Sequence, residues 1–358
     1  MSDSSDTILI TGGAGFVGSN LALFFKADFP DRKIICLDNL KRRGSELNCP
    51  RLAVANIDFI HGDIRNPEDI EAVGPIDLLV ECSAEPSVLA GIGSSPMYAV
   101  NTNLVGTVNC LEHARKHRAK VIFLSTSRVY PLGPLNQLQL REDPQRFELV
   151  EHQAFPGVSR RGIAESFPLT GPRSLYGATK LCSELLIAEY QAMYGVDAIV
   201  NRCGVLAGPW QMGKVDQGVL VLWAARHVFG GDLAYIGYGG KGKQVRDILH
   251  VKDLYRLLTK QISDFRRHSG EVYNVGGGLA MSVSLAQLTE LCQEASGNAI
   301  SIARVPETRP ADIPWYVTDY SKVAAATGWE PSIPPEEIVK DIVEWIHAYK
   351  DTLRAILS

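Results

Sequence analysis

The sequence predicts an α/β protein in which a doubly wound parallel sheet is followed by a smaller C-terminal α/β lobe. Two observations predict this class. In the first half of the 358 residues, short apolar stretches rich in β-branched residues alternate with amphipathic helical patterns. Strands that are apolar along their whole length belong in parallel sheets that helices cover on both faces. The first strand also leads directly into a glycine-rich turn and a helix, as many doubly wound sheets do.

The candidate strands are short, apolar and bounded by turns. We expect them at 7–11, 33–38, 58–63, 76–82, 120–126 and 197–203. The helical patterns between them lie at 16–27, 67–74, 95–117 and 176–194. After residue 205, glycine and proline become more frequent and the strands become shorter. Helices are expected there at 251–265, 283–297 and 335–348.

Composition and charge exclude several classes of partner. The formal net charge of −4 argues against nucleic acid or an anionic membrane as the main partner. No apolar run approaches the roughly 20 residues that span a bilayer, and the N-terminal "MSDSSDTILIT" lacks the pattern of a signal peptide. Seven cysteines without CxxC spacing indicate a reduced, cytoplasmic protein. Eight scattered histidines without metal-ligand spacing predict no metal site.

The glycine-rich turn "TGGAGFVGSN" places Gly12, Gly15 and Gly18 between the first strand and the first helix. The pyrophosphate of a dinucleotide must approach the backbone N–H groups at a helix N-terminus, where a side chain would block it. A turn of this kind is weak evidence by itself, but the strand before it and the helix after it supply the required context. We therefore predict a Rossmann dinucleotide site, which includes the intervening Phe16 and Val17.

Acidic residues follow the second and third strands. Asp38 lies 20 residues after Gly18, where an acid accepts hydrogen bonds from the adenosine ribose hydroxyls. Because it also repels a 2′-phosphate, it favours NAD over NADP, although the basic run 41–43 can weaken that preference. Asp63 ends the third strand, and it suits either the cap of the next helix or the adenine amino group.

These observations divide the chain into an NAD-binding domain at 1–204 and a lobe at 205–358. We expect the chain to cross back between them near 245–280. The segment 132–170 is long, polar and weakly patterned, and we treat it as an insert in the first domain. Connections of this length are usually functional loops, so a lid is one interpretation.

The stretch "SLYGATK" places Tyr176 and Lys180 one helical turn apart, on one helix face. A nearby ammonium lowers the pKa of a tyrosine and makes it a usable base near neutral pH. The YxxxK pattern alone is more often an ordinary surface helix. Thr126 ends the fifth strand, and ligands of doubly wound sheets bind beyond the carboxyl ends of the strands. Its hydroxyl therefore either caps the next turn or faces the cofactor.

Together these motifs resemble an extended short-chain dehydrogenase/reductase. The stretches "NTNLVGT", "RDILHVKDL", "YNVGGG" and "RPAD" match further signatures of that family, and the resemblance covers nearly the whole chain. It implies a nucleotide-sugar substrate bound by the C-terminal lobe and a homodimer formed by the helices at 95–117 and 176–194. It also implies cofactor contacts by the residues Asn39, Ile64, Ser83, Ala84, Asn103 and Ser125.

Within that family, the Asp216-Gln217-Gly218 stretch and the long insert resemble the CDP-tyvelose (CDP-paratose) 2-epimerases. The resemblance implies that tightly bound NAD oxidises a nucleotide-diphosphate sugar, with a CDP-hexose favoured, at C2. The keto sugar turns, and the hydride returns to its opposite face. Tyr176 moves the proton, Lys180 holds the nicotinamide ribose, and Thr126 binds the reacting oxygen. The implied substrate contacts are Glu85, Ser127, Gln217, Arg246, Arg309 and Asp312.

The chain also departs from the family's pattern. Glu81 stands where His is frequent, Glu85 where Gln is frequent, and Val205 where many relatives have Asn. These changes leave the identity of the sugar open. A 4-epimerase or a decarboxylase on the same scaffold is the alternative function, and a non-catalytic NAD sensor is a more distant one.

Dehydration of the sugar is disfavoured by the residues after Thr126. Sugar dehydratases carry an Asp-Glu pair there, whereas this chain has Ser127 and Arg128. The sequence therefore favours epimerisation over dehydration.

Overall fold

The computed structural model describes residues 6–213 and 217–357. These residues form two compact units, and the chain passes between the units several times. The first unit consists of the described parts of Met1–Thr126, Leu175–Arg202 and Tyr255–Val272. The second unit consists of those of Ser127–Ser174, Cys203–Leu254 and Tyr273–Ser358.

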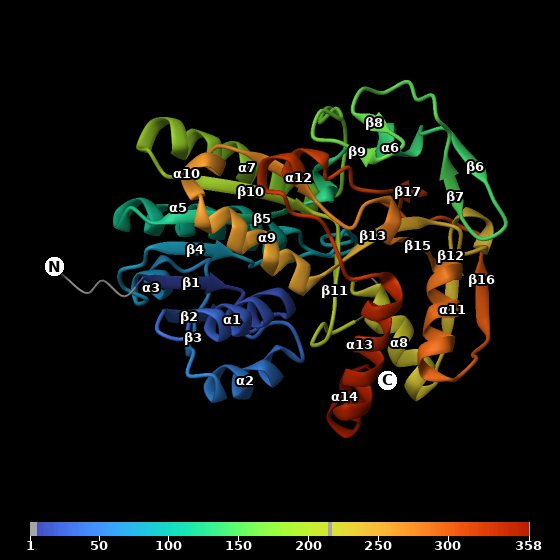
Figure 1. Cartoon of the computed structure of the whole chain (residues 1–358), viewed down its shortest axis with the longest axis horizontal. Coiled ribbons are helices and arrows are strands. Elements are labelled where there is room, and N and C mark those ends of the chain that lie inside the picture. The colour runs from blue at the N-terminus through green and yellow to red at the C-terminus, as the bar shows by residue number, and fades with distance from the viewer. Residues whose placement is uncertain (1–5, 214–216, 358) are drawn as a thin grey trace. The chain divides into compact units, whose positions relative to one another are not determined.

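A seven-stranded parallel sheet is the centre of the fold, which confirms the predicted class (Figure 1). Its strand order is β14-β10-β5-β4-β1-β2-β3. The strands are β1 (Thr7–Thr11), β2 (Lys33–Asp38), β3 (Asp58–His61), β4 (Leu78–Glu81), β5 (Lys120–Thr126), β10 (Ala198–Cys203) and β14 (Val272–Val275). Every residue of β1 is buried, because β2 pairs with one of its edges and β4 with the other. The order reverses between β1 and β4, which is where ligands bind in such sheets.

Helices of the first unit pack on this sheet, and their apolar faces form its core. Leu9 and Phe123 of the sheet are buried against Leu111 and Ile187 of two helices. The helices are α1 (Phe16–Asp28), α2 (Cys49–Val54), α3 (Pro67–Glu71), α4 (Met97–Val100), α5 (Gly106–His117), α7 (Leu175–Tyr194), α9 (Val251–Ser263), whose first residues belong to the second unit, and α10 (Phe265–His268).

The helix expected at 95–117 is divided in the structure. A π-helical turn, Asn101–Val105, separates α4 from α5. Such a turn inserts an extra residue per turn and often marks a functional position. It contains Asn103, one of the predicted cofactor contacts.

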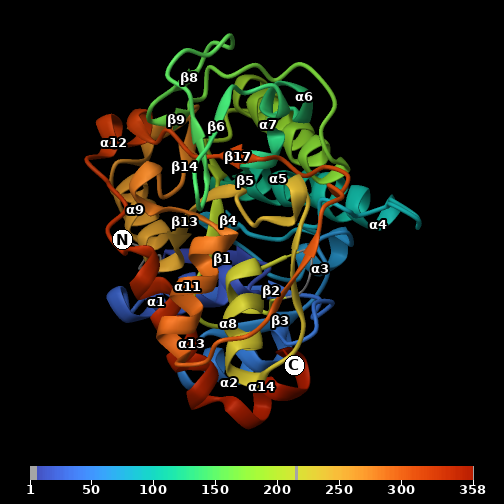
Figure 2. The ribbon, with the colours of Figure 1, turned by 90° about the vertical axis from the view of Figure 1, so that its right-hand side faces the viewer.

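The second unit combines small sheets with a group of helices, of which α8, α11 and α13 lie side by side (Figure 2). In the main small sheet β13 pairs with β11, β15 and β17, and elsewhere β12 pairs with β16. The strands are β11 (Val205–Ala207), β12 (Leu233–Ile236), β13 (Val245–His250), β15 (Ser282–Ser284), β16 (Ile302–Val305) and β17 (Trp315–Tyr316). The helices are α8 (Val219–Phe229), α11 (Leu285–Ser296), α12 (Ser321–Thr327), α13 (Pro335–Ala348) and α14 (Lys350–Leu357). Among the described residues, no helix of either unit is long and apolar enough to cross a membrane.

The segment 132–170 has regular structure of its own, in contrast to the loop suggested by its weak pattern. It contains α6 (Leu132–Asn136), a hairpin of β6 (Leu140–Glu142) and β7 (Phe147–Leu149), and a hairpin of β8 (Val158–Ser159) and β9 (Gly162–Ile163). Distant parts of the second unit hold these hairpins. The Phe147 N–H donates to the Lys243 carbonyl, and the Ile163 N–H donates to the Val317 carbonyl.

Candidate functional site

The predicted site residues separate cleanly by unit. The candidates for cofactor binding and catalysis, together with Glu85, lie in the first unit. The other substrate candidates, Ser127, Gln217, Arg246, Arg309 and Asp312, lie in the second. Gln217 is half-buried, and its neighbour Asp216 lies outside the described residues.

The glycine-rich loop has the geometry that a pyrophosphate requires. Gly12 has a φ of 64°, which lets the chain turn sharply after β1. The Gly15 N–H donates to the Gly12 carbonyl at 3.0 Å. A Cβ added to Gly18 would lie 2.3 Å from the Gly12 oxygen, so no side chain fits there. No side chain caps α1, and no acid lies in its first turn. The N-terminus of the helix therefore presents N–H groups and positive partial charge to an anion, so the loop fits NAD.

Hydrogen bonds of Asn48 and Arg51, which the sequence did not predict, also hold this loop. The Asn48 amide donates to the Ala14 carbonyl at 2.8 Å, and Arg51 donates to Asn48 and to Asn20 of α1. Asn48 is 1% exposed. The pair lies more than 30 residues from the loop in sequence, so no local motif indicates it.

Asp38 ends β2 beside the loop. Its carboxylate accepts the Ala14 N–H at 3.1 Å and the Leu40 N–H at 2.8 Å. Burial raises the pKa of Asp38, and these backbone donors oppose that shift. The hydrogen bonds fix the orientation of the carboxylate at the position expected for ribose recognition.

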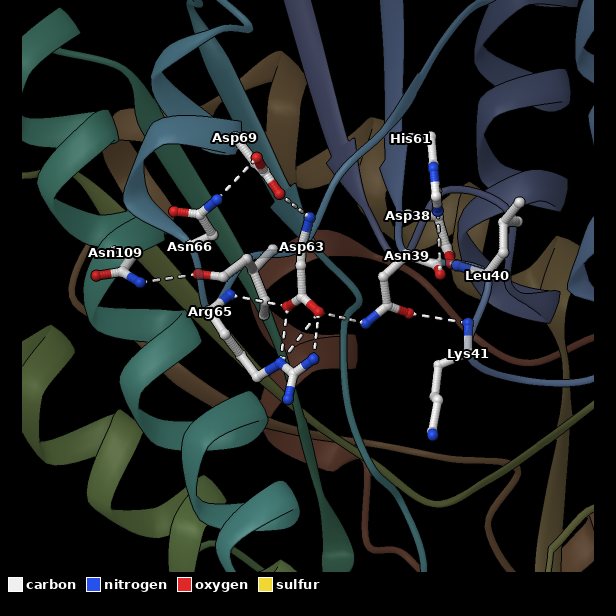
Figure 3. A network of polar contacts seen from close by, with 11 residues as sticks. Asp38, Asn39, Leu40, Lys41, His61, Asp63, Arg65, Asn66, Asp69 and Asn109 are labelled. Atoms are coloured by element: carbon white, nitrogen blue, oxygen red, sulfur yellow. Dashed lines mark hydrogen bonds and ion pairs between the residues drawn. The ribbon is translucent and has the colours of Figure 1, made fainter.

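Asp63 lies at the centre of a polar network beside Asp38 (Figure 3). It accepts hydrogen bonds from the Arg65 guanidinium at 2.6–3.0 Å and from the Asn39 amide at 2.8 Å. Burial pushes its pKa up, but the donors of Arg65 and Asn39 outweigh this and bring the pKa of Asp63 to about 2. Ile64 is buried next to it, and its carbonyl accepts from Asn109.

Asn103 connects the segment after β4 to α7. Its side chain exchanges hydrogen bonds with the backbone of Glu85, at 2.7 and 3.1 Å, and donates to Thr179 at 3.1 Å. Its carbonyl accepts from Ser183 at 2.9 Å. Asn103 thus holds α7 against the segment containing Ser83, Ala84 and Glu85, all of which are half-buried.

The end of β5 is fixed by a buried ion pair. The Ser125 hydroxyl donates to Glu184 of α7, and Arg202 of β10 donates to both oxygens of Glu184 at 2.7–3.1 Å. This network, which the sequence did not predict, anchors α7 to the sheet. Thr126 is the next residue and is 7% exposed.

Helix α7 carries both Tyr176 and Lys180. Tyr176 is half-buried, whereas Lys180 is 1% exposed. The Lys180 ammonium lies 3.7 Å from the carboxylate of Glu81, itself 1% exposed, and 3.9 Å from the centre of the Phe123 ring. The YxxxK motif therefore does not belong to an ordinary surface helix, because its lysine is buried beside the end of β4.

Several arginines of the second unit lie at one turn, formed by residues 309–313. Arg246 of β13 donates to the Asp312 carboxylate at 3.1 Å and to the Ile313 carbonyl at 2.7 Å. Arg309 begins the same turn, since its carbonyl accepts the Asp312 N–H, and Arg128 donates to the Ala311 carbonyl at 3.3 Å. The predicted substrate contacts Arg246, Arg309 and Asp312 therefore meet at this turn. Arg128 also contacts it, and we call the turn at 309–313 the cationic turn.

The comparisons with known proteins agree with this architecture. Residues 8–276 match the model of the NAD dependent epimerase/dehydratase family. The chain is 30% identical to the CDP-paratose 2-epimerase of Salmonella typhi over 94% of this chain and 98% of that one.

Two solved structures share the fold. The UDP-glucose 4-epimerase of Thermotoga maritima has a TM-score of 0.76 and 25% identity, covering 97% of this chain and 99% of that one. The dTDP-glucose 4,6-dehydratase of Bacillus anthracis, in complex with NAD, has a TM-score of 0.76 and 26% identity, covering 98% and 99%.

The fold and the glycine-rich loop define an NAD-dependent enzyme with a Rossmann sheet. The chain belongs to the NAD-dependent epimerase/dehydratase family, which confirms the resemblance drawn from its motifs. NAD is its cofactor.

Proposed function

We propose that the protein is a nucleotide-sugar epimerase that inverts C2 of a CDP-hexose. The observation that carries the epimerase assignment is the burial of Lys180 on the Tyr176 face of α7, in the same unit as Thr126 and the glycine-rich loop. The choice of C2 and of CDP rests on the similarity to the Salmonella typhi 2-epimerase.

Bound NAD would supply the hydride chemistry, first as the acceptor of the hydride and then as its donor to the same carbon. The residues of this chain would position the sugar and move one proton. Tyr176 accepts the proton of the ring hydroxyl and later gives it back, Lys180 favours the phenolate, and Thr126 donates a hydrogen bond to the reacting oxygen. No net oxidation occurs, so one tightly held cofactor serves every cycle.

The cationic turn of the second unit suits the diphosphate of the substrate. Guanidinium groups bind phosphate oxygens with two parallel donors, and Arg246 and Arg309 lie at this turn. Arg128 would contribute a third guanidinium. Asp312 orients Arg246 and so limits the poses that the arginine can adopt.

Product analysis tests this function directly. The purified protein is incubated separately with CDP-, UDP-, GDP- and dTDP-hexoses, and the products are separated and assigned by NMR. We expect inversion at C2 of a CDP-hexose without a net change in NADH. A 4-epimer from a UDP-sugar, with C2 unchanged, would establish the alternative that the Thermotoga maritima 4-epimerase represents. A deoxy-keto sugar would establish dehydration, which Ser127 and Arg128 disfavour.

The expected homodimer is a further proposal, supported by exposed apolar residues on the two helices concerned. Leu185, Met193 and Tyr194 on α7 are 62%, 70% and 59% exposed, and Val105 beside α5 is 42% exposed. Exposed apolar groups of this size often mark protein interfaces. Leu185→Glu should reduce the mass in sedimentation to that of one chain. The matched control Val54→Glu, at a position 87% exposed on α2, should leave the mass unchanged.

A further inference from the structure

Glu81 is an unusual neighbour for the lysine of a proton relay. It is the last residue of β4, next to β1 at the point where the strand order reverses. Its side chain and that of Lys180 are each 1% exposed, and their charged groups lie 3.7 Å apart. The Thr107 hydroxyl lies 3.5 Å from the same carboxylate oxygen. A fully buried ion pair costs much desolvation free energy, so its presence calls for a function.

We propose that Glu81 is a positioning residue that keeps Lys180 charged and fixed beside Tyr176. An ammonium buried without a counter-charge tends to lose its proton, and a neutral lysine no longer favours the phenolate. The ammonium has three N–H donors, so the ion pair with Glu81 leaves donors for a cofactor hydroxyl. This inference rests on the proposed roles of Tyr176 and Lys180.

The surroundings contain no other charge that could replace Glu81 among the described residues that face the pair. On β5, Phe123 presents its ring to the ammonium and adds a cation–π contact. On α5, Cys110 is buried, and burial followed by the Glu81 charge raises its pKa well above the usual value, so it stays a neutral thiol. On α7, Glu184 is already paired with Arg202. Burial likewise raises the pKa of Glu81, and the Lys180 charge opposes that shift.

The test is a titration of Tyr176 in the NAD-loaded protein, without any sugar. The chain has 12 tyrosines. The tyrosinate absorbance of each protein minus that of the matched Tyr176→Phe protein isolates the one residue. We expect a midpoint well below the usual value of about 10 in the native protein. In Glu81→Gln the midpoint should rise by about one unit or more, because Lys180 loses its counter-charge.

Three further comparisons test the interpretation. Glu81→Asp keeps the charge on a shorter arm, so its midpoint should rise less; this variant also preserves the test if Glu81→Gln does not fold. In a Lys180→Met background, which has no buried cation, Glu81→Gln should cause no additional shift. Asp253→Asn removes a buried carboxylate of the second unit that accepts from Ser332 and Ile333. It should lower the melting temperature and leave the midpoint unchanged.

The outcomes distinguish the relay itself from the role of Glu81 in it. An ordinary Tyr176 midpoint in the native protein would overturn the relay and the role of Glu81 together. A low native midpoint that Glu81→Gln leaves unchanged or lowers further would overturn only the role of Glu81. An added shift in the Lys180→Met background would show that Glu81 does not act through Lys180. None of these results depends on which sugar the enzyme uses.

Discussion

The two units build their candidate sites in different ways. In the first unit, the cofactor site follows from the backbone: a tight glycine turn, the N-terminus of α1, and side chains at successive strand ends. In the second unit, the cationic turn is assembled from side chains far apart in sequence. Arg128 and Arg246 meet the turn at 309–313, and Lys241 holds the hairpin of β6 and β7 through Glu142, 99 positions away. The glycine loop of the candidate cofactor site is therefore encoded locally, whereas the candidate substrate site depends on contacts between distant parts of the chain.

The largest expected effect concerns the relay in the first unit. Tyr176→Phe should lower kcat by about 100- to 10,000-fold, because Tyr176 is the residue proposed to move the hydroxyl proton. NAD retention should be unchanged, as measured by release of the nucleotide on denaturation. Tyr190→Phe is the matched control on the same helix, since its hydroxyl donates to Glu112, an exposed residue of α5. If the Tyr176→Phe protein kept its activity, the assignment of the catalytic residue to the first unit would be wrong.

The next effect tests the backbone origin of the cofactor site. Gly18→Ala places a methyl group 2.3 Å from the Gly12 oxygen. The local rearrangement that relieves this overlap costs about 1–3 kcal/mol. We expect NAD to bind about 10- to 100-fold more weakly, measured by calorimetry. Gly133→Ala in α6 is the control, because a Cβ there meets no atom within 4 Å. Unchanged NAD affinity in Gly18→Ala would mean that the loop does not hold the pyrophosphate.

The same difference explains what the sequence could predict. Six of the seven strands, the glycine loop and Asp38 depend on local periodicity and spacing, and those six strands were predicted within a few residues. Strand β14 at the edge of the sheet was not predicted. Helix α8 was not predicted, because Leu220–Ala225 are all buried and leave no amphipathic pattern. The Glu81–Lys180 pair joins β4 to α7 across 99 positions. Glu81 stood out in the sequence only as a departure from the family's pattern, which gave no indication of its partner.

A smaller effect should appear when the second unit is changed. Arg246→Gln removes a charged donor, and such bonds are worth about 1.5–3 kcal/mol, so KM for the nucleotide sugar should rise at least tenfold. NAD affinity should stay the same, because the cofactor candidates all belong to the first unit. Arg141→Gln is the control, since that exposed arginine pairs with its near neighbour Asp143. If KM stayed constant while NAD affinity fell, the proposed assignment of cofactor binding to the first unit and of substrate binding to the second would be wrong.

The smallest effect concerns the hairpin of β6 and β7. Exposed Glu142 accepts from Lys241 and Lys243, each at 2.8 Å, and the lysine hydrogen bonds lower its pKa to about 2. A carboxyl whose pKa is depressed on folding stabilises the fold above its unfolded pKa and loses that contribution as the pH falls. The hairpin should therefore loosen between about pH 4.5 and pH 2.

Hydrogen exchange of residues 140–149 measures this loosening. The native protein should lose protection as the pH falls from about 4.5 to about 2, whereas Glu142→Gln should be less protected at the higher pH and change little on acidification. The effect should be slight, because exposed ion pairs contribute little and salt screens them. Glu151→Gln, which removes the pair with Arg160 in the same segment, should behave like the native protein at 140–149. Equal protection in Glu142→Gln and the native protein at every pH would assign the attachment of the hairpin to its backbone bonds alone, such as the one from Phe147 to Lys243.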